Sequence, residues 1–257
     1  MNMLDLFSGI GGFAVSAKWA LGKKVNVVGF CEIDEFCQTI LKKHFPKVPI
    51  YDDVKIVNNK IIKRKIDIIT GGFPCQDISL AGKGKGIEGE RSGLWKEMYR
   101  IIGEFRPRWA IIENVSALTS RGLTVVLNDL AKAGYDAEWQ CISAREVGAR
   151  HKRERIWVVA YPSSLRLQCK KKDQELDGER PSKSSSRDGI QIEEDSLSES
   201  SVGRVVDGVS YWLHEPNVSR VQKEGFARKE RIHSLGNSIV PQIPYIIFKK
   251  IKELEGL

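Results

Sequence analysis

The chain has 257 residues, 41% of them hydrophobic, and a formal net charge of +8. This length allows one sizeable core and a small second domain, but not two large ones. The positive charge fits an acidic partner, although charge alone does not separate DNA from RNA or from an anionic membrane surface. No basic leader opens the chain and no apolar run is long enough to cross a bilayer, so we expect a cytoplasmic protein with no membrane partner.

Cysteine and histidine usage argues against two classes of site. The five cysteines are odd in number and form no Cys-x-x-Cys pair, and the four histidines are scattered. We therefore expect neither a disulfide framework nor a structural metal site.

Short β-rich segments alternate with helix-like segments over the first 160 residues. The expected strands are Met3–Phe7, Val25–Phe30, Ile66–Thr70, Trp109–Glu113, Glu138–Ser143 and Arg155–Tyr161. The expected helices are Phe13–Leu21, Glu35–His44, Leu94–Phe105 and Thr124–Ala133. This alternation predicts an α/β fold with a mostly parallel sheet and helices on both faces. Ligands bind such sheets beyond the C-terminal ends of the strands, where the strand order switches.

The composition changes after the last expected strand. Residues 162–201 include no aromatic residue and carry seven Lys or Arg against nine Asp or Glu. This composition predicts a mobile insert, because it buries too little apolar surface to fold alone. Pro241–Leu254 is periodic enough to predict a helix that returns to the sheet. The expected organisation is a main domain at 1–160, a small region at 161–231 that holds the insert, and a C-terminal segment at 232–257.

A glycine-rich turn, Asp5–Phe13 (DLFSGIGGF), follows the first expected strand. Glycines there allow a tight turn and a close approach to a ligand. About twenty residues later, Cys31–Asp34 (CEID) places a carboxylate where it suits the two hydroxyls of a ribose. Such turns are often only structural, and this one lacks the glycine spacing of a dinucleotide-binding fingerprint. The motif alone leaves both interpretations open.

A second turn, Gly71–Ser79 (GGFPCQDIS), presents Cys75 directly after Pro74 at the end of an apolar strand. A buried core cysteine is the ordinary alternative. The end of a strand in a doubly wound sheet is, however, where reactive groups are placed. The segment 80–93 contains five glycines, two lysines and an arginine, which predicts a mobile basic lid.

Charged residues mark the ends of two further strands. Glu113 ends an apolar strand, where partial desolvation would raise its pKa and let it hold a proton near neutral pH. A capping or salt-bridged glutamate is the commoner alternative. Arg153 and Arg155 belong to a basic run that leads into the last strand, where alternate residues point to one side. A basic run is usually only a solvated face.

In this order the motifs resemble the DNA (cytosine-5)-methyltransferases of bacteria and their phages, over residues 4–160 and about 202–246. The matching segments are Asp5–Phe13, Cys31–Asp34, Asp52–Val54, Gly71–Ser79, Glu113–Val115, Arg153–Arg155 and Gly236–Ser238. The resemblance implies a Rossmann-like S-adenosylmethionine-dependent fold and methylation of a flipped-out cytosine. The domain at 1–160 would be catalytic and cofactor-binding, and 161–231 would read the DNA target.

The resemblance also implies roles for individual residues. Cys75 would attack C6 of cytosine, Glu113 would act at N3, and Arg153 and Arg155 would orient the base. The residues expected to contact DNA or the base are Gln76, Ser79 and Arg91. The residues expected to bind S-adenosylmethionine, and its product S-adenosylhomocysteine, are Phe7, Gly9, Gly11, Glu32, Ile33, Asp53, Val54, Pro74, Leu94 and Asn237.

The expected partner is double-stranded DNA, the expected state is a monomer, and a cognate restriction endonuclease is left open. His151 stands where the family usually has Gln, which puts the role of that position in doubt. RNA is the main alternative substrate, since a related branch methylates tRNA, but Phe73-Pro74-Cys75 favours DNA over the Pro-Pro-Cys of that branch. A non-catalytic DNA-binding protein and a nicotinamide oxidoreductase are disfavoured by the intact candidate residues and by the glycine spacing.

Overall fold

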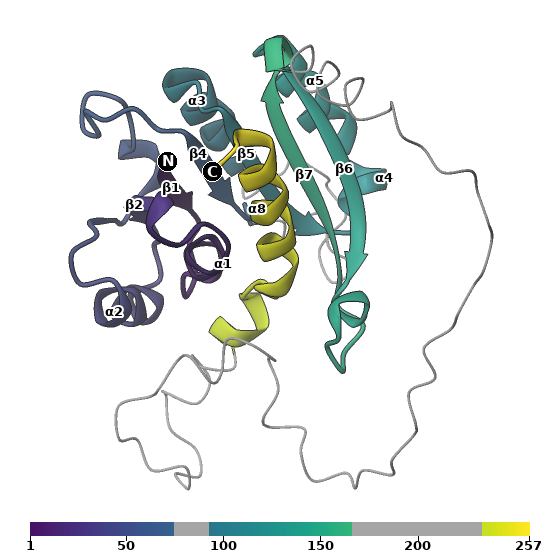
Figure 1. Ribbon diagram of the computed structural model, residues 1–257, viewed down its shortest axis with the longest axis horizontal. Helices are drawn as coiled ribbons and strands as arrows, with labels where there is room; N and C mark the ends of the chain where they lie inside the picture. The colour runs from purple at the N-terminus through teal and green to yellow at the C-terminus, as the bar shows by residue number, and fades with distance from the viewer. Residues whose placement is uncertain (75–92, 166–232) are drawn as a thin grey trace, which may run out of the picture.

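A computed structural model describes residues 1–74, 93–165 and 233–257 of the chain (Figure 1). Its strands form one seven-stranded sheet in the order β3-β2-β1-β4-β5-β7-β6. They are β1 (Asn2–Leu6), β2 (Asn26–Cys31), β3 (Ile50–Tyr51), β4 (Ile68–Gly71), β5 (Trp109–Val115), β6 (Tyr135–Ser143) and β7 (Glu154–Pro162). The pairs from β3 to β5 are parallel, whereas β7 runs antiparallel to both β5 and β6. The predicted α/β fold with a mostly parallel sheet is confirmed.

Helices cover both faces of this sheet (Figure 1). The α-helices are α1 (Gly12–Leu21), α2 (Glu35–His44), α3 (Leu94–Phe105), α4 (Leu118–Arg121), α5 (Leu123–Lys132) and α8 (Gln242–Glu255). Short 3-10 helices lie at η1 (Gly22–Lys24), η2 (Val54–Ile56) and η4 (Ala144–Val147). Buried side chains of α3 and α5 belong to the core on one face, and those of α1 and α8 belong to the core on the other.

Side chains alternate along β1, so each face of this strand contributes to one of the two hydrophobic cores. Leu4 and Leu6 point into the core beneath α3 and α5, whereas Met3 points into the core beneath α1 and α8. Successive side chains of a strand lie on opposite faces, so a strand covered on both faces must be apolar on both. Asp5 breaks this rule, because it is fully buried on the face that also holds Met3.

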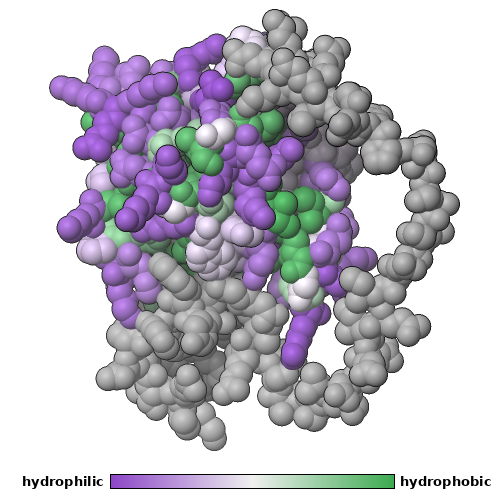
Figure 2. All heavy atoms as spheres, in the orientation of Figure 1, coloured by the Kyte–Doolittle hydropathy of each residue, from purple (hydrophilic) through white to green (hydrophobic). Residues whose placement is uncertain are grey.

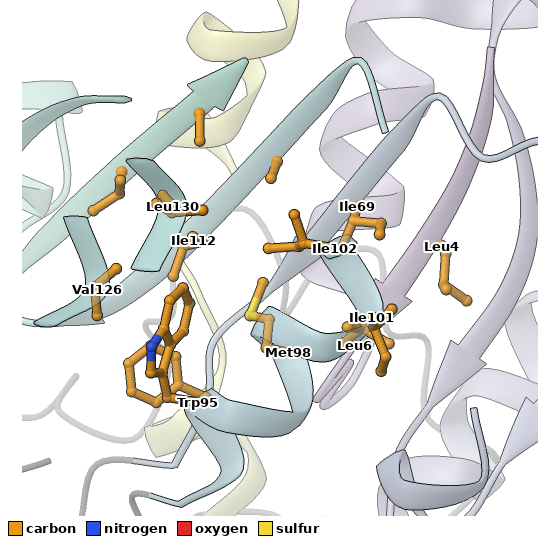
Figure 3. Close-up of a cluster of buried hydrophobic side chains, with 14 of the residues drawn as sticks. Leu4, Leu6, Ile69, Trp95, Met98, Ile101, Ile102, Ile112, Val126 and Leu130 are labelled. Carbon is orange, nitrogen blue, oxygen red and sulfur yellow. The ribbon is translucent and has the colours of Figure 1, made fainter. Parts of the chain in front are cut away.

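Helix α3 is held to the sheet by an apolar stripe. Trp95, Met98, Ile101 and Ile102 follow the helical period and are almost fully buried, and Figure 3 shows them against strand residues that include Ile69. Each such side chain contributes about 1.5–3 kcal/mol through burial. The helix therefore has a fixed position relative to the strand ends beside it.

The C-terminal segment packs onto the first helix. Ser16 of α1 donates a hydrogen bond to the carbonyl of Pro241, with 2.9 Å between the oxygens. A Cβ at Gly12 would lie 2.6 Å from Cγ1 of Ile239, so α1 and this segment approach each other closely. The expected closing helix is α8, which lies beside α1 in Figure 1.

All six expected strands differ from the structure at one or both ends, by one to three residues: β5, for example, continues two residues further, to Val115. The two-residue strand β3 was not expected. β4 begins at Ile68 and ends at Gly71, and β6 begins three residues early, at Tyr135. β6 is an edge strand, and its exposed centre at 138–140 hides the apolar alternation that would reveal its full length. The expected insert at 162–201 lies outside the described residues from 166 onward, and most of the expected lid at 80–93 lies outside them too.

One face of the molecule is mainly hydrophilic where described residues form its surface (Figure 2). Figure 2 shows polar side chains over most of the visible face, with smaller apolar groups between them. Within residues 1–74, 93–165 and 233–257, every helix is too short or too polar to span a bilayer.

Candidate functional site

Most of the predicted site residues in the described part of the chain lie near the C-terminal ends of the parallel strands, which together form one edge of the sheet. β1, β2, β4 and β5 are parallel, so the segments that follow them emerge at the same edge. β7 runs the other way, so its first residues, beginning at Glu154, start from that edge. The fold thus gathers five segments that are distant in sequence.

The turn between β1 and α1 has an unusual backbone. Phe7 and Gly9 both have a φ of 53°, and Gly11 has a φ of 87°. Glycine adopts such angles freely, but a non-glycine residue there stores strain of about 1–3 kcal/mol. The turn is secured by Ser8, whose backbone N–H donates to the carbonyl of Cys31 at 3.0 Å. The strained Phe7 is therefore held in place by the neighbouring strand β2.

Glu32, directly after β2, is fixed by the same turn. Its carboxylate accepts backbone hydrogen bonds from Gly9 at 2.6 Å and from Asp34 at 2.9 Å. Burial raises the pKa of Glu32, while these two hydrogen bonds act in the opposite direction. The oxygens keep further lone pairs, so the group is an oriented acceptor for hydroxyl groups. Next to it, Ile33 exposes 79% of its surface, an apolar face beside a carboxylate.

Two further predicted cofactor residues lie at η2. Asp53 is half-buried and caps η2, since its side chain accepts the backbone N–H of Lys55 at 2.9 Å. Val54 is buried in the core cluster that also contains α3. Phe7 and Leu94 both pack against this cluster as partly buried side chains. Val54, Phe7 and Leu94 thus contribute to one apolar region, and Asp53 directly precedes Val54 in the chain.

At the same edge, Glu113 of β5 and Arg155 of β7 form an ion pair, with 3.2 Å between Arg155 Nε and Glu113 Oε1. Only 9% of the Glu113 surface is exposed. Burial raises the pKa of its carboxyl, while the charges of Arg155 and Arg153 act in the opposite direction. A Cβ at Gly72 would lie 2.8 Å from Glu113 Oε2, so the carboxyl group occupies the space above this glycine.

Arg153 links this pair to the C-terminal segment. Its Nη1 donates to the carbonyl of Gly236, which precedes Asn237. Its Nε is buried without a hydrogen-bond partner among the described residues, and burial lowers the pKa of its guanidinium. The side chain of Asn237 is exposed and lies 3.1 Å from the His233 ring. His151, the departure from the family pattern, has a buried Nδ1 that also lacks a partner in the described part of the chain.

The segment that precedes Cys75 is anchored at its root. Asn114 Nδ2 donates to the carbonyl of Phe73 at 3.1 Å, and the Phe73 ring packs against Trp95 with centroids 5.5 Å apart. Pro74 is exposed. Cys75, Gln76, Ser79 and Arg91 lie outside the described residues. The structure therefore places the residues around the predicted nucleophile, up to Pro74.

Sequence reasoning missed several residues that support this edge. Asp5 is fully buried; its Oδ1 accepts a hydrogen bond from Thr70 at 2.6 Å, and its Oδ2 has no partner among the described residues. Burial raises the pKa of Asp5 well above its usual value. The available signal was a lone acid inside an apolar strand. No sequence signal pointed to Asn114 as an anchor of Phe73, or to Gly72 as the space for Glu113.

Within the described ranges, no group of three His, Cys, Asp or Glu side chains is arranged to hold a metal ion. The chemistry available at the edge consists of carboxylates, guanidinium groups, backbone N–H groups and apolar faces. Glu32, Asp53, Phe7 and Ile33 offer acceptors for hydroxyl and amino groups beside apolar surface, and this set fits a nucleoside.

Comparisons with known proteins identify the family of the chain. The family model described as C-5 cytosine-specific DNA methylase matches residues 1–201. The chain is 33% identical over 168 residues to Type II methyltransferase M2.BsuMI of Bacillus subtilis, covering 62% of this chain and 42% of that protein. It is 33% identical over 172 residues to Type II methyltransferase M.HhaI of Haemophilus parahaemolyticus, covering 65% of this chain and 51% of that protein. The chain spans about half the length of these curated relatives.

A solved structure shows the same fold at lower identity. The methyltransferase EhMeth of Entamoeba histolytica superposes with a TM-score of 0.63 at 18% identity, covering 100% of this chain and 98% of that one. The likeness concerns the architecture of the backbone.

Proposed function

Because this chain belongs to the C-5 cytosine-specific DNA methylase family, we propose that it transfers a methyl group from S-adenosylmethionine to C5 of a cytosine in duplex DNA. The observation that carries the proposal is the ion pair between buried Glu113 and partly exposed Arg155, with the Glu113 carboxyl over Gly72, three residues before Cys75. Addition to a cytosine ring needs a thiol, a proton donor and a fixed cation beside the base. Glu113 and Arg155 would supply the second and third, and Cys75, three residues after Gly72, would supply the first.

In the proposed reaction, the Cys75 thiolate forms a bond to C6 while Glu113 gives its proton to N3. Electron density then accumulates at C5. S-adenosylmethionine supplies the methyl group and leaves as S-adenosylhomocysteine. The N3 proton returns to Glu113 as the methyl group is transferred. A water molecule then takes the C5 proton, the C6–S bond breaks to release the Cys75 thiolate, and the aromatic ring is restored. Arg155 holds the Glu113 carboxyl in position and would face the base.

The raised pKa of Glu113 supports its role as the acid. A carboxyl with an ordinary pKa would be ionised near neutral pH and would have no proton to give. Burial opposes ionisation, whereas the two arginines favour it. The raised pKa makes protonation easier than for an ordinary carboxyl, and the two arginines would stabilise the carboxylate once the proton has been transferred.

The cofactor proposal rests on the nucleoside-like set of groups beside β1 and β2. Glu32 would accept hydrogen bonds from the ribose hydroxyls, because backbone N–H groups already fix the direction of its oxygens. Asp53 would accept a hydrogen bond from the amino group of adenine. Phe7, Ile33 and Leu94 would provide apolar contact with the ring. Gly9, Gly11, Val54, Pro74 and Asn237 would complete the pocket.

The DNA proposal extends to parts of the chain outside the described residues. The cytosine would be flipped out of the duplex, at a cost of a few kcal/mol. We propose that Gln76, Ser79 and Arg91 contact the base or its phosphates and that the region 161–231 reads the target sequence. A monomer would suffice for this chemistry, and a restriction endonuclease that cuts the same site would be the natural partner of such a modification enzyme.

The test uses the covalent step. Bisulfite sequencing of DNA from cells that express the protein identifies the methylated site. A duplex with 5-fluorocytosine at that site is then mixed with the enzyme and S-adenosylmethionine. Fluorine replaces the C5 hydrogen that a base must remove as a proton during elimination. Elimination is therefore blocked, and the enzyme should remain attached to DNA on a denaturing gel.

Matched variants define the nucleophile. Cys75→Ser should abolish the adduct, because a hydroxyl is a far weaker nucleophile than a thiolate at neutral pH. Cys141→Ser changes a cysteine of β6 that is not among the residues assigned to the proposed site, although its register partner Ile156 follows Arg155, and should leave the adduct intact. An adduct that persists in Cys75→Ser, or that maps to another cysteine, would overturn the assignment. Methyl transfer to tRNA and not to duplex DNA would replace the DNA proposal with the RNA alternative.

A further inference from the structure

Helix α3 carries an arginine that reaches across to η2, the short helix that follows Asp53. Nη2 of Arg100 donates to the carbonyl of Val54 at 3.2 Å and to the carbonyl of Val57 at 2.9 Å. Val54 opens η2, and Val57 is its C-terminal cap. A cation at this end of a helix satisfies carbonyls that have weak partners or none inside the helix. Arg100 therefore fixes η2 to α3.

The guanidinium is itself oriented from both sides. Nε of Arg100 lies 2.9 Å from Glu97 Oε2, and Nη1 lies 2.7 Å from Glu104 Oε1. Both glutamates lie on α3, at spacings of three and four residues. Each nitrogen of the guanidinium thus has a partner and a single role: Nε and Nη1 orient the group, and Nη2 holds η2. Lysine offers one nitrogen on a flexible chain and does not reproduce this fork.

The position of η2 matters because of the residues at its start. Asp53 caps η2 through the backbone N–H of Lys55, so its carboxylate moves with the helix. Leu94 is the first residue of α3, the helix that bears Arg100. A contact between α3 and η2 therefore sets the separation of two walls of the proposed cofactor pocket. Val54 is buried in the core, which limits how far the segment shifts but does not orient its carbonyl.

We propose that Arg100 is a positioning residue for cofactor recognition: it holds Asp53 where the carboxylate reads the amino group of the purine. The proposal rests on the proposed function and goes beyond it, because it assigns base selectivity to a residue that does not touch the cofactor. The ordinary alternative is that Arg100 only stabilises α3 through Glu97 and Glu104. Partly exposed ion pairs of that kind contribute about 0–1 kcal/mol.

Base selectivity separates the two roles. S-inosylhomocysteine differs from S-adenosylhomocysteine at the purine C6, where an oxygen replaces the amino group, so only the latter donates a hydrogen bond to Asp53. Calorimetric titration of the full chain with each ligand gives a ratio of dissociation constants. We expect a ratio of about tenfold or more in the wild type, the size of one hydrogen bond to a charged group. Asp53→Ala should reduce the ratio to near one.

Arg100→Met should reduce the ratio nearly as much as Asp53→Ala, and the double variant should show little further loss. Such non-additivity is the signature of two residues acting on one interaction. Arg100→Lys should restore the ratio only in part. Lys96→Met is the matched control, since Lys96 is an exposed residue of the same helix with a side chain of similar length. It should keep the wild-type ratio.

A second control separates selectivity from helix stability. The double variant Glu97→Gln and Glu104→Gln removes the ion pairs but leaves the arginine and the carbonyls of η2. It should lower the melting temperature and largely keep the ratio. If Arg100→Met lowers the melting temperature but keeps the wild-type ratio, the inference is overturned while the proposed function stands. If the wild type binds both ligands equally, the role of Asp53 fails and the inference fails with it. If the wild type binds neither, the proposed cofactor itself is wrong.

Discussion

Gly72 and Glu113 share one small volume: a Cβ on Gly72 would lie 2.8 Å from Oε2 of the glutamate. A methyl group there would force the buried carboxyl to move or to rotate away from Arg155. Gly72→Ala should therefore reduce methyl transfer by about 100-fold, since a displacement of about 1 Å is enough for that loss. Initial rates with saturating DNA and cofactor measure the effect.

Gly103→Ala is the matched control for this substitution. Gly103 lies in α3, and a Cβ there would meet nothing within 4 Å. Replacing a helical glycine by alanine should raise stability by about 0.5–1 kcal/mol and leave the methylation rate unchanged. Equal rates for Gly72→Ala and Gly103→Ala would contradict the proposed contact between Gly72 and the catalytic acid.

The cofactor site gives a second prediction. Glu32→Ala should weaken S-adenosylmethionine binding by about 10–100-fold, because it removes a charged acceptor and also leaves the amides of Gly9 and Asp34 without their partner. Phe7→Ala should weaken binding to a smaller degree through loss of ring contact. Calorimetric titration measures both, with the exposed Glu35→Ala as the control. Unchanged affinity in both variants would remove these residues from the pocket.

Much of this edge was predictable because its signals are local. The apolar alternation of β1, the continuous apolar run of β5 and the glycines of the first turn all lie within short windows of sequence. Parallel strands then bring the ends of distant segments to one edge without further information. For this reason the sequence placed Glu32 directly after β2, where the structure has it, and Glu113 within two residues of the end of β5. Their chemical roles, and that of Cys75, remain predictions.

The contacts that tune the site were not predictable, because they join residues far apart in the chain. Arg100 bonds to carbonyls more than forty positions earlier, and carbonyls have no sequence signature. Thr70 reaches Asp5 across two neighbouring strands, a register that only the folded sheet defines. The antiparallel pairing of β6 with β7 was foreseeable, since the connection 144–153 is shorter than the dozen or so residues that a parallel crossover needs. The position of β7 between β5 and β6 has no such local signal.

The anchor of the nucleophile segment gives a third prediction. Asn114 donates to the buried carbonyl of Phe73, two residues before Cys75. Asn114→Ala should lower the free energy of unfolding by about 1–3 kcal/mol, because it leaves that carbonyl unpaired. It should also slow adduct formation with 5-fluorocytosine DNA. Urea unfolding and gel quantification check the two effects, with the exposed Asn59→Ala as control. An Asn114→Ala variant as stable as that control would show that the hydrogen bond contributes nothing.

The last prediction concerns the pH dependence of stability at Glu113. Burial raises the pKa of this carboxyl in the folded chain, whereas in the unfolded chain it titrates near its usual value of about 4.3. The native state therefore binds more protons than the unfolded state between these two values. The stability that the protonated carboxyl contributes is fully present below the unfolded pKa and is lost as pH rises through the folded pKa.

Glu113→Gln cannot titrate, so the variant should gain stability relative to wild type as pH rises through this window, and the gain should level off above it. Urea unfolding between pH 4 and pH 8 measures the difference, and the exposed Glu35→Gln should show no comparable rise. The rate of methyl transfer by Glu113→Gln should fall, since glutamine keeps the shape of the acid but has no proton to give to N3. A stability difference that is flat or falls with pH would mean that Glu113 is ionised in the resting enzyme. The acid role proposed for it would then be untenable.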